Sequence, residues 1–212
     1  MAETVSGQEV LAALDRLASD LVAHAEELRA LDAAIGDGDL GITITIGCGA
    51  VRDALPALDP GDIGAALSKA GMALNRKAAS TFGALVATMG MRAGREAKGR
   101  AEIGLAEIAA MCRAAAEGVK ERGKSDVGQK TLLDALVPAA EALETAAAEG
   151  TSLSEALRRA AAAAEEGARA TEGMKSQVGR ASWFTDRTAG TRDPGAQAIA
   201  LAFASLAGAA EG

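Results

Sequence analysis

Aromatic side chains are nearly absent from this sequence. They make up 2% of the 212 residues, with one Trp, three Phe and no Tyr. Proteins that bind single-stranded nucleic acid stack bases on aromatic side chains, and this chain has few to offer. Its net charge of −7 also opposes binding to a phosphate backbone. We therefore expect no nucleic-acid partner.

Long apolar runs and cysteines are also scarce. No apolar run approaches the roughly 18 residues that a membrane-spanning helix needs, and the N-terminus lacks the basic-then-apolar order of a signal peptide. We expect no membrane partner. Cys48 and Cys112 are too few for a disulfide framework, so we interpret them as reduced packing residues. These absences favour a cytoplasmic protein.

The sequence is rich in alanine, and its apolar residues recur with helical spacing. An Ala-rich chain with few aromatics favours closely packed helices over sheets. Leucines recur at three- and four-residue steps over residues 8–31, which predicts one amphipathic helix there. The residues Ile42–Ile46 alternate like a strand, but we assign them to a helix because no strand partner is evident nearby. Periodicity and capping signals predict further helices over residues 62–74, 81–93, 105–122, 131–148, 151–171 and 193–207.

One connection in this helical pattern is unusually long. Residues 172–192 are rich in Gly, Ser, Thr and Arg, and they contain the only tryptophan, Trp183. Connections of this length in a compact domain are usually binding loops or lids. We therefore expect this segment to border a functional site.

The stretch LDAAIGDGDLG at residues 31–41 is the densest cluster of charge. Asp32, Asp37 and Asp39 lie within eight residues, and the glycines between them permit a bend that brings the three carboxylates together. Oxygen-only ligand sets suit Mg²⁺ or Ca²⁺, and bound Mg²⁺ commonly bridges carboxylates to nucleotide phosphates. The alternative is a solvated turn, in which Asp and Gly are only good turn formers.

Two familiar motifs do not explain this stretch. A literal G-x-G-x-x-G match begins at Gly36, but a dinucleotide-binding fold requires a strand before the motif and here a helix precedes it. An EF-hand loop counted from Asp37 would need Glu at its twelfth position, where Cys48 stands.

Several ordered motifs resemble a known protein family. They are LDAAIGDGDLG (31–41), GMAL (71–74), ASTFGAL (79–85), RGKSDVGQKTLLDAL (122–136), GRASWFTDRTAG (179–190) and TRDPGAQA (191–198). Together they extend over nearly the whole chain and resemble the ADP-binding L subunits of dihydroxyacetone kinase, the DhaL-type family. The resemblance implies an all-α fold over residues 1–212: one domain, an antiparallel barrel of about eight amphipathic helices with the nucleotide site at one end.

The resemblance also implies which residues form the site. Asp32, Asp37 and Asp39 would hold Mg²⁺, two ions in the family, against the phosphates of ADP or ATP. No residue of this chain takes a catalytic role of its own. The positions implied to contact the nucleotide are Leu40, Gly41, Ile42, Thr43, Thr81, Phe82, Gly123, Leu132, Arg180, Asp193, Pro194 and Gly195.

A two-component kinase is implied as well. In the family, a histidine on a different subunit or domain holds the ketose covalently. This chain has one histidine, His24, which borders the apolar stripe of the first predicted helix, and we interpret it as a surface residue. We expect a phosphotransferase subunit that is inactive without a substrate-binding K-type subunit. Its phosphoryl donor would be ATP or a phosphoprotein, and the chain would form a homodimer.

Three positions depart from the family pattern. Leu40 stands where His is usual, Thr81-Phe82 where Ser or Gly is usual, and Trp183 where Tyr is usual. None of these departures affects the three Asp residues. They leave two ketose substrates open, dihydroxyacetone and a tetrulose. They also leave a different function open, a non-catalytic nucleotide-binding regulatory module. A third possibility, a lipid carrier with an Ala-lined helical interior, would give the Asp cluster no role.

Overall fold

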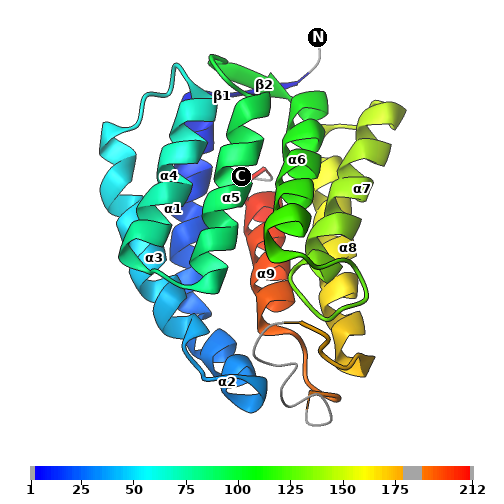
Figure 1. The fold of residues 1–212 in the computed structure, drawn as a ribbon. Helices are drawn as coiled ribbons and strands as arrows, with labels where there is room; N and C mark the ends of the chain where they lie inside the picture. Colours follow the sequence, from blue (N-terminus) through cyan, green and yellow to red (C-terminus); the bar gives the residue numbers. More distant parts are fainter. Residues whose placement is uncertain (1–2, 179–187, 211–212) are drawn as a thin grey trace.

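A computed structural model describes residues 3–178 and 188–210, and this part of the chain is almost entirely helical (Figure 1). A short antiparallel sheet pairs β1 (Thr4–Ser6) with β2 (Glu102–Gly104), and two 3₁₀ turns are η1 (Leu55–Ala57) and η2 (Thr171–Gly173). The α-helices are α1 Gly7–Ala23, α2 Ala25–Ile35, α3 Leu40–Ala54, α4 Ile63–Lys77, α5 Thr81–Glu96, α6 Leu105–Gly123, α7 Leu133–Glu149, α8 Leu153–Ala170 and α9 Pro194–Ala209. The all-α class predicted from the sequence is confirmed.

The helices pack on one another in a closed order. Helix α1 packs on α3, α3 on α4, each later helix on the next through α9, and α9 returns to α1. Helix α2 is an addition to this ring and packs on α3 and α9. Small residues let the helices approach closely: a Cβ at Gly167 would lie 2.0 Å from the carbonyl oxygen of Asp134, and one at Gly64 would lie 2.2 Å from that of Gly94. The high alanine content serves the same close packing.

Apolar side chains fill the space between these helices. The largest buried cluster joins α6 to α9 and includes Leu133, Leu136 and Leu143 of α7. A separate apolar cavity of about 190 Å³ lies among α1, α3, α4, α5 and α9. None of the helices in the described ranges combines the length and the hydropathy that a membrane-spanning segment requires.

Helix starts agree with the capping signals in the sequence. The side chain of Ser152 accepts a hydrogen bond from the backbone N–H of Glu155 at the start of α8. Asp193 caps α9 by accepting from the N–H of Ala196 (2.8 Å), with Pro194 at the first helical position. The segment Ile42–Ile46 lies within α3, as predicted.

Two local features differ from the sequence prediction. The single helix predicted over residues 8–31 is broken at His24, whose φ of −97° and ψ of 8° end α1 and begin α2. No proline or glycine marks this break. The strands β1 and β2 are three residues each, too short for alternation to reveal, and they pair across about a hundred positions of sequence.

Candidate functional site

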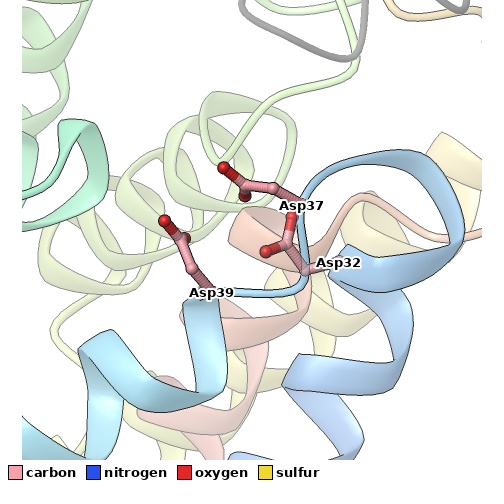
Figure 2. Close-up of side chains that lie close together, drawn as sticks. All are labelled: Asp32, Asp37 and Asp39. Carbon is pink, nitrogen blue, oxygen red and sulfur yellow. The ribbon is translucent and has the colours of Figure 1, made fainter.

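Three carboxylates converge on the loop between α2 and α3. Asp32 lies in the last turn of α2, Asp37 lies in the loop, and Asp39 is the N-cap residue of α3. Each offers one carboxylate oxygen such that all three oxygens lie within 4.8 Å of one another. Figure 2 shows the three side chains gathered at this loop. Asp32 is partly buried, whereas Asp37 and Asp39 are exposed.

Backbone geometry holds the loop in this shape. The N–H of Gly36 donates to the carbonyl oxygen of Asp32 (2.6 Å), and Gly38 takes a left-handed conformation with φ of 75°. Asp32 Oδ2 accepts from the N–H of Leu40 (3.0 Å), which ties the end of α2 to the start of α3. The side chain of Asp39 makes no capping hydrogen bond to α3.

The carboxylates border a cavity of about 290 Å³ in which four helices begin. The residues at the N-caps of α3, α5, α7 and α9 are Asp39, Ser80, Leu132 and Asp193, and all four line this cavity. The N-terminal ends of helices carry unpaired N–H groups and a partial positive charge, which attract anions. The cavity therefore combines a cluster of carboxylates that could hold a cation with helix N-termini that favour anions.

Apolar side chains form another part of the cavity wall. Phe82, Leu85, Val119 and Leu132 line it from α5, α6 and the start of α7. An apolar wall beside charge-binding groups suits a ligand with a flat ring at one end and phosphates at the other.

The structure brings most of the predicted site residues to this cavity. Those that line it are Asp32, Asp37, Asp39, Leu40, Thr81, Phe82, Gly123, Leu132, Asp193, Pro194 and Gly195. Three predicted positions in the first turn of α3 lie outside the lining. Gly41 packs against α2, Ile42 is 57% exposed, and Thr43 is buried. Arg180 and Trp183 lie outside the described residues.

Other lining residues were not among the positions predicted to contact the metal or the nucleotide. They are Ile35, Gly36, Ser80, Leu85, Val119, Ser125, Lys130, Thr131, Ser176 and Val178. Lys130 stands out among them because it is 2% exposed. Lys130 lies in the stretch RGKSDVGQKTLLDAL, directly before the apolar start of a predicted helix. A charged side chain at that position was the one sign in the sequence that could have drawn attention to it.

Asp193 has an unusual environment among the acids of the cavity. Removal from water raises the pKa of its carboxyl to about 7, and the negative charge of Asp134 acts in the same direction. The N–H of Ala196 and the ammonium of Lys130 lower the pKa but do not cancel this effect. Asp193 therefore changes charge near neutral pH.

We expect Asp193→Asn to stabilise the ligand-free protein at neutral and higher pH. The folded carboxyl ionises near pH 7 against an ordinary pKa of 3.8, so the folded state binds more protons than the unfolded state between these values. The group's contribution to the free energy of unfolding therefore falls as the pH rises from about 4 to about 7. Asn imitates the neutral acid and keeps an oxygen that can cap α9.

Denaturant unfolding of both proteins across this range tests the expectation. The stability advantage of Asp193→Asn should grow with pH and reach on the order of 2–4 kcal/mol above pH 7. An advantage that is constant with pH would contradict the raised pKa.

The loop fits a hard divalent cation. Its three acidic side chains offer only carboxylate oxygens, the ligand type that Mg²⁺ and Ca²⁺ prefer over nitrogen or sulfur. They lie in one short segment, 32–39, and all three border the open volume of the cavity. A cation held by them would face the helix N-termini across the cavity, where it could share an anionic ligand with them.

Known proteins resemble this chain over nearly its whole length. The family model described as DAK2 domain matches residues 34–208. The chain is 34% identical over 208 residues to the ADP-binding subunit DhaL of a PEP-dependent dihydroxyacetone kinase from Escherichia coli, and the match covers 98% of this chain and 99% of that protein. It is also 37% identical over 204 residues to a D-erythrulose kinase from Mycolicibacterium smegmatis, covering 93% of this chain and 34% of that protein.

A solved structure shares the fold. The dihydroxyacetone kinase from C. freundii in complex with AMP-PNP and Mg²⁺ matches with a TM-score of 0.74 and 25% sequence identity, covering 98% of this chain and 35% of that one. The chain thus spans about a third of these longer kinases and almost all of the E. coli subunit. The match of residues 34–208 to the family model, together with the near-complete alignment to the E. coli subunit, shows that this chain belongs to the DAK2 domain family.

Proposed function

We propose that this chain binds ADP or ATP with Mg²⁺ in the cavity and serves as the phosphoryl-transferring subunit of a short-chain ketose kinase. The observation that carries this proposal is the meeting of three carboxylates and four helix N-termini in one cavity. A divalent cation and a polyphosphate need these two kinds of group side by side. The near-full-length similarity to an ADP-binding kinase subunit supports the same reading.

Each wall of the cavity has a distinct part in this proposal. Asp32, Asp37 and Asp39 would hold Mg²⁺, which when bound neutralises phosphate charge and favours in-line transfer. The backbone N–H groups of Thr81 and Phe82, in the first turn of α5, would donate to phosphate oxygens. Arg180 is a further proposed phosphate contact, on the basis of the family resemblance.

The other walls of the cavity would contact the adenine ring and close the site. The apolar side chains of Leu85, Val119 and Leu132 offer a surface for the adenine ring, with Gly123 at its border. The turn of Asp193, Pro194 and Gly195 would close the site from the start of α9. Two Mg²⁺ ions, rather than one, remain part of the proposal.

The partner and the substrate are proposed from the relatives. A substrate-binding K-type subunit would hold the ketose, and ATP or a phosphoprotein would supply the phosphoryl group. The similarity to a dihydroxyacetone kinase subunit favours dihydroxyacetone, and that to a D-erythrulose kinase favours a four-carbon ketose. A homodimer in the cytoplasm completes the proposal.

Calorimetric titration of the purified chain tests the nucleotide site. ADP should bind at one site per chain when Mg²⁺ is present, and binding should be lost or greatly weakened in EDTA. AMP should bind much more weakly than ADP, because it lacks the β-phosphate that would reach the carboxylate-held cation. Equal affinities for AMP and ADP, or affinity that is unaffected by EDTA, would contradict the proposed arrangement.

One observation favours a second candidate, a nucleotide-binding regulatory module without transfer activity. Leu40 follows the last Asp of the loop, and its side chain lies in a buried apolar cluster with Leu28 and Ile44. It therefore offers no polar group to the phosphates where the family usually has His. The two candidates share nucleotide binding and differ in whether a ketose phosphate forms.

A further inference from the structure

Lys130 is a charged residue in the interior of the described structure. It lies in the connection between α6 and α7, is 2% exposed, and borders the cavity. Its backbone is left-handed, with φ of 61°, a conformation that Lys124 shares among the described non-glycine residues. A buried lysine in a disfavoured backbone conformation requires strong compensating contacts.

Backbone carbonyl oxygens provide those contacts. The Nζ of Lys130 donates to the carbonyl oxygens of Thr171 (2.7 Å), Thr188 (2.7 Å) and Thr191 (2.5 Å), and a fourth, that of Met174, lies at 3.2 Å. An ammonium has three N–H donors, which match the three short contacts. Burial lowers the pKa of Lys130, although Asp193, Glu172 and Asp134 act against this shift.

These contacts join three segments that each line the cavity. The first is 129–132, which contains Lys130 and begins α7. The second is 171–178, which contributes Ser176 and Val178, and the third is 188–195, which contributes the cap of α9. Lys130 is the residue at which all three segments meet.

Further contacts connect the same segments in pairs. The N–H of Gly190 donates to the carbonyl oxygen of Glu172 (2.8 Å), and the N–H of Asp193 donates to Thr171 Oγ1 (2.8 Å). The N–H of Ser176 donates to Thr188 Oγ1 (3.0 Å), and that of Gln177 donates to the carbonyl oxygen of Gln129 (3.3 Å). The carboxylate of Asp134 fixes the connection that carries Lys130, accepting from the N–H groups of Gly128 (2.6 Å) and Thr131 (2.7 Å). Asp134 therefore fixes the backbone around Lys130, and the lysine side chain extends from there to the other two segments.

We propose that Lys130 is a positioning residue, whose ammonium joins segments 129–132, 171–178 and 188–195 into one preformed wall of the nucleotide cavity. The proposal rests on the nucleotide-binding function proposed above. Because carbonyl oxygens take the donors of Lys130, its effect on the nucleotide is indirect. Without the ammonium, the three segments are held to one another less firmly in the free protein, and binding must order them again, which weakens affinity.

The test compares Lys130→Met with Lys124→Met. Both lysines lie in the same connection with left-handed backbones, but Lys124 is exposed and does not line the cavity. In the ligand-free protein, we expect Lys130→Met to speed hydrogen exchange at the amides of Ser176, Gln177 and Gly190 and to leave amides of α3 and α4 unchanged. Mg²⁺–ADP affinity should fall by about tenfold or more. Lys124→Met should change neither quantity.

Acylation of the wild-type protein supplies a measurement that does not depend on how the variant folds. Coupling between the wall and the nucleotide is reciprocal, so saturation with Mg²⁺–ADP should slow acetylation of Lys130 while Lys124 reacts at the same rate. An unchanged acetylation rate at Lys130, or exchange at Ser176, Gln177 and Gly190 that matches wild type in a folded Lys130→Met, would overturn the proposal. Failure of wild type to bind Mg²⁺–ADP would instead overturn the proposed function. The hydrogen-exchange comparison would still test whether Lys130 holds the three segments together.

Discussion

Asp37→Asn is expected to remove most of the thermal stabilisation that Mg²⁺ and ADP give to this protein. Asn is nearly isosteric with Asp but has no charge, so the loop keeps its shape and loses one of three carboxylates. A ligand that no longer binds the native state cannot shift unfolding. The apo melting temperature is recorded for both proteins, because Asn removes one of three like charges whose carboxylate oxygens lie within 4.8 Å of one another.

The size of the effect follows from mass action. A ligand at a hundred times its Kd stabilises the native state by about 2.7 kcal/mol. For a chain of this length, that corresponds to a rise of roughly 5–10 °C in melting temperature. Asp37→Asn should lose most of this rise.

Thermal melts in EDTA, in Mg²⁺ and in Mg²⁺ plus ADP measure this shift in melting temperature directly. Asp53→Asn is the matched control, because Asp53 is exposed near the far end of α3 and its replacement changes the net charge equally. A wild-type shift in Asp37→Asn would show that the loop is a solvated turn and not the metal site.

The parts of this structure that the sequence predicted are those with local causes. The carboxylate loop depends on Asp and Gly within residues 31–41, so its geometry is set by its own residues. The caps at Ser152 and Asp193 bond to amides three residues away. The family motifs added the remote walls of the cavity, which no local pattern could have joined to the loop.

The parts that were missed depend on contacts distant in sequence. Strand β1 exists because residues 102–104 pair with it. The role of Lys130 depends on carbonyl oxygens 41 to 61 positions further along the chain. The run Leu40–Thr43 was assigned to the nucleotide as a block, but successive residues of a helix point in different directions, and the structure places only Leu40 of these four in the cavity wall.

The purified chain alone, with Mg²⁺ and ATP, is expected to form no ketose phosphate. The family resemblance implies that the ketose is held by a histidine of another subunit, and the proposed function gives the one histidine of this chain no such part. His24 lies at the junction of α1 and α2, is nearly half exposed (46% of its side chain), and has its Nδ1 2.9 Å from Glu27 Oε2. It is not among the residues that line the cavity. The phosphoryl group would therefore have no positioned acceptor.

Addition of a substrate-binding subunit should supply that acceptor. Positioning of two reactants is worth several orders of magnitude in rate, so we expect ketose phosphate formation to rise at least about a hundredfold over the chain alone. Trioses and tetruloses should be tested in parallel. ATP and a phosphoprotein donor should be used in separate arms, since either could supply the phosphoryl group.

Two variants make the outcome specific to this chain. Asp37→Asn should abolish product formation in the complete mixture, because it removes one of the three proposed cation ligands. His24→Asn should leave the rate unchanged, because the proposed function places the acceptor on the partner subunit. Robust product from the chain alone, lost in His24→Asn, would contradict the two-component function. A complete mixture that binds Mg²⁺–ADP but forms no ketose phosphate with either donor would identify the chain as the regulatory module, with Leu40 as the first residue to restore to His.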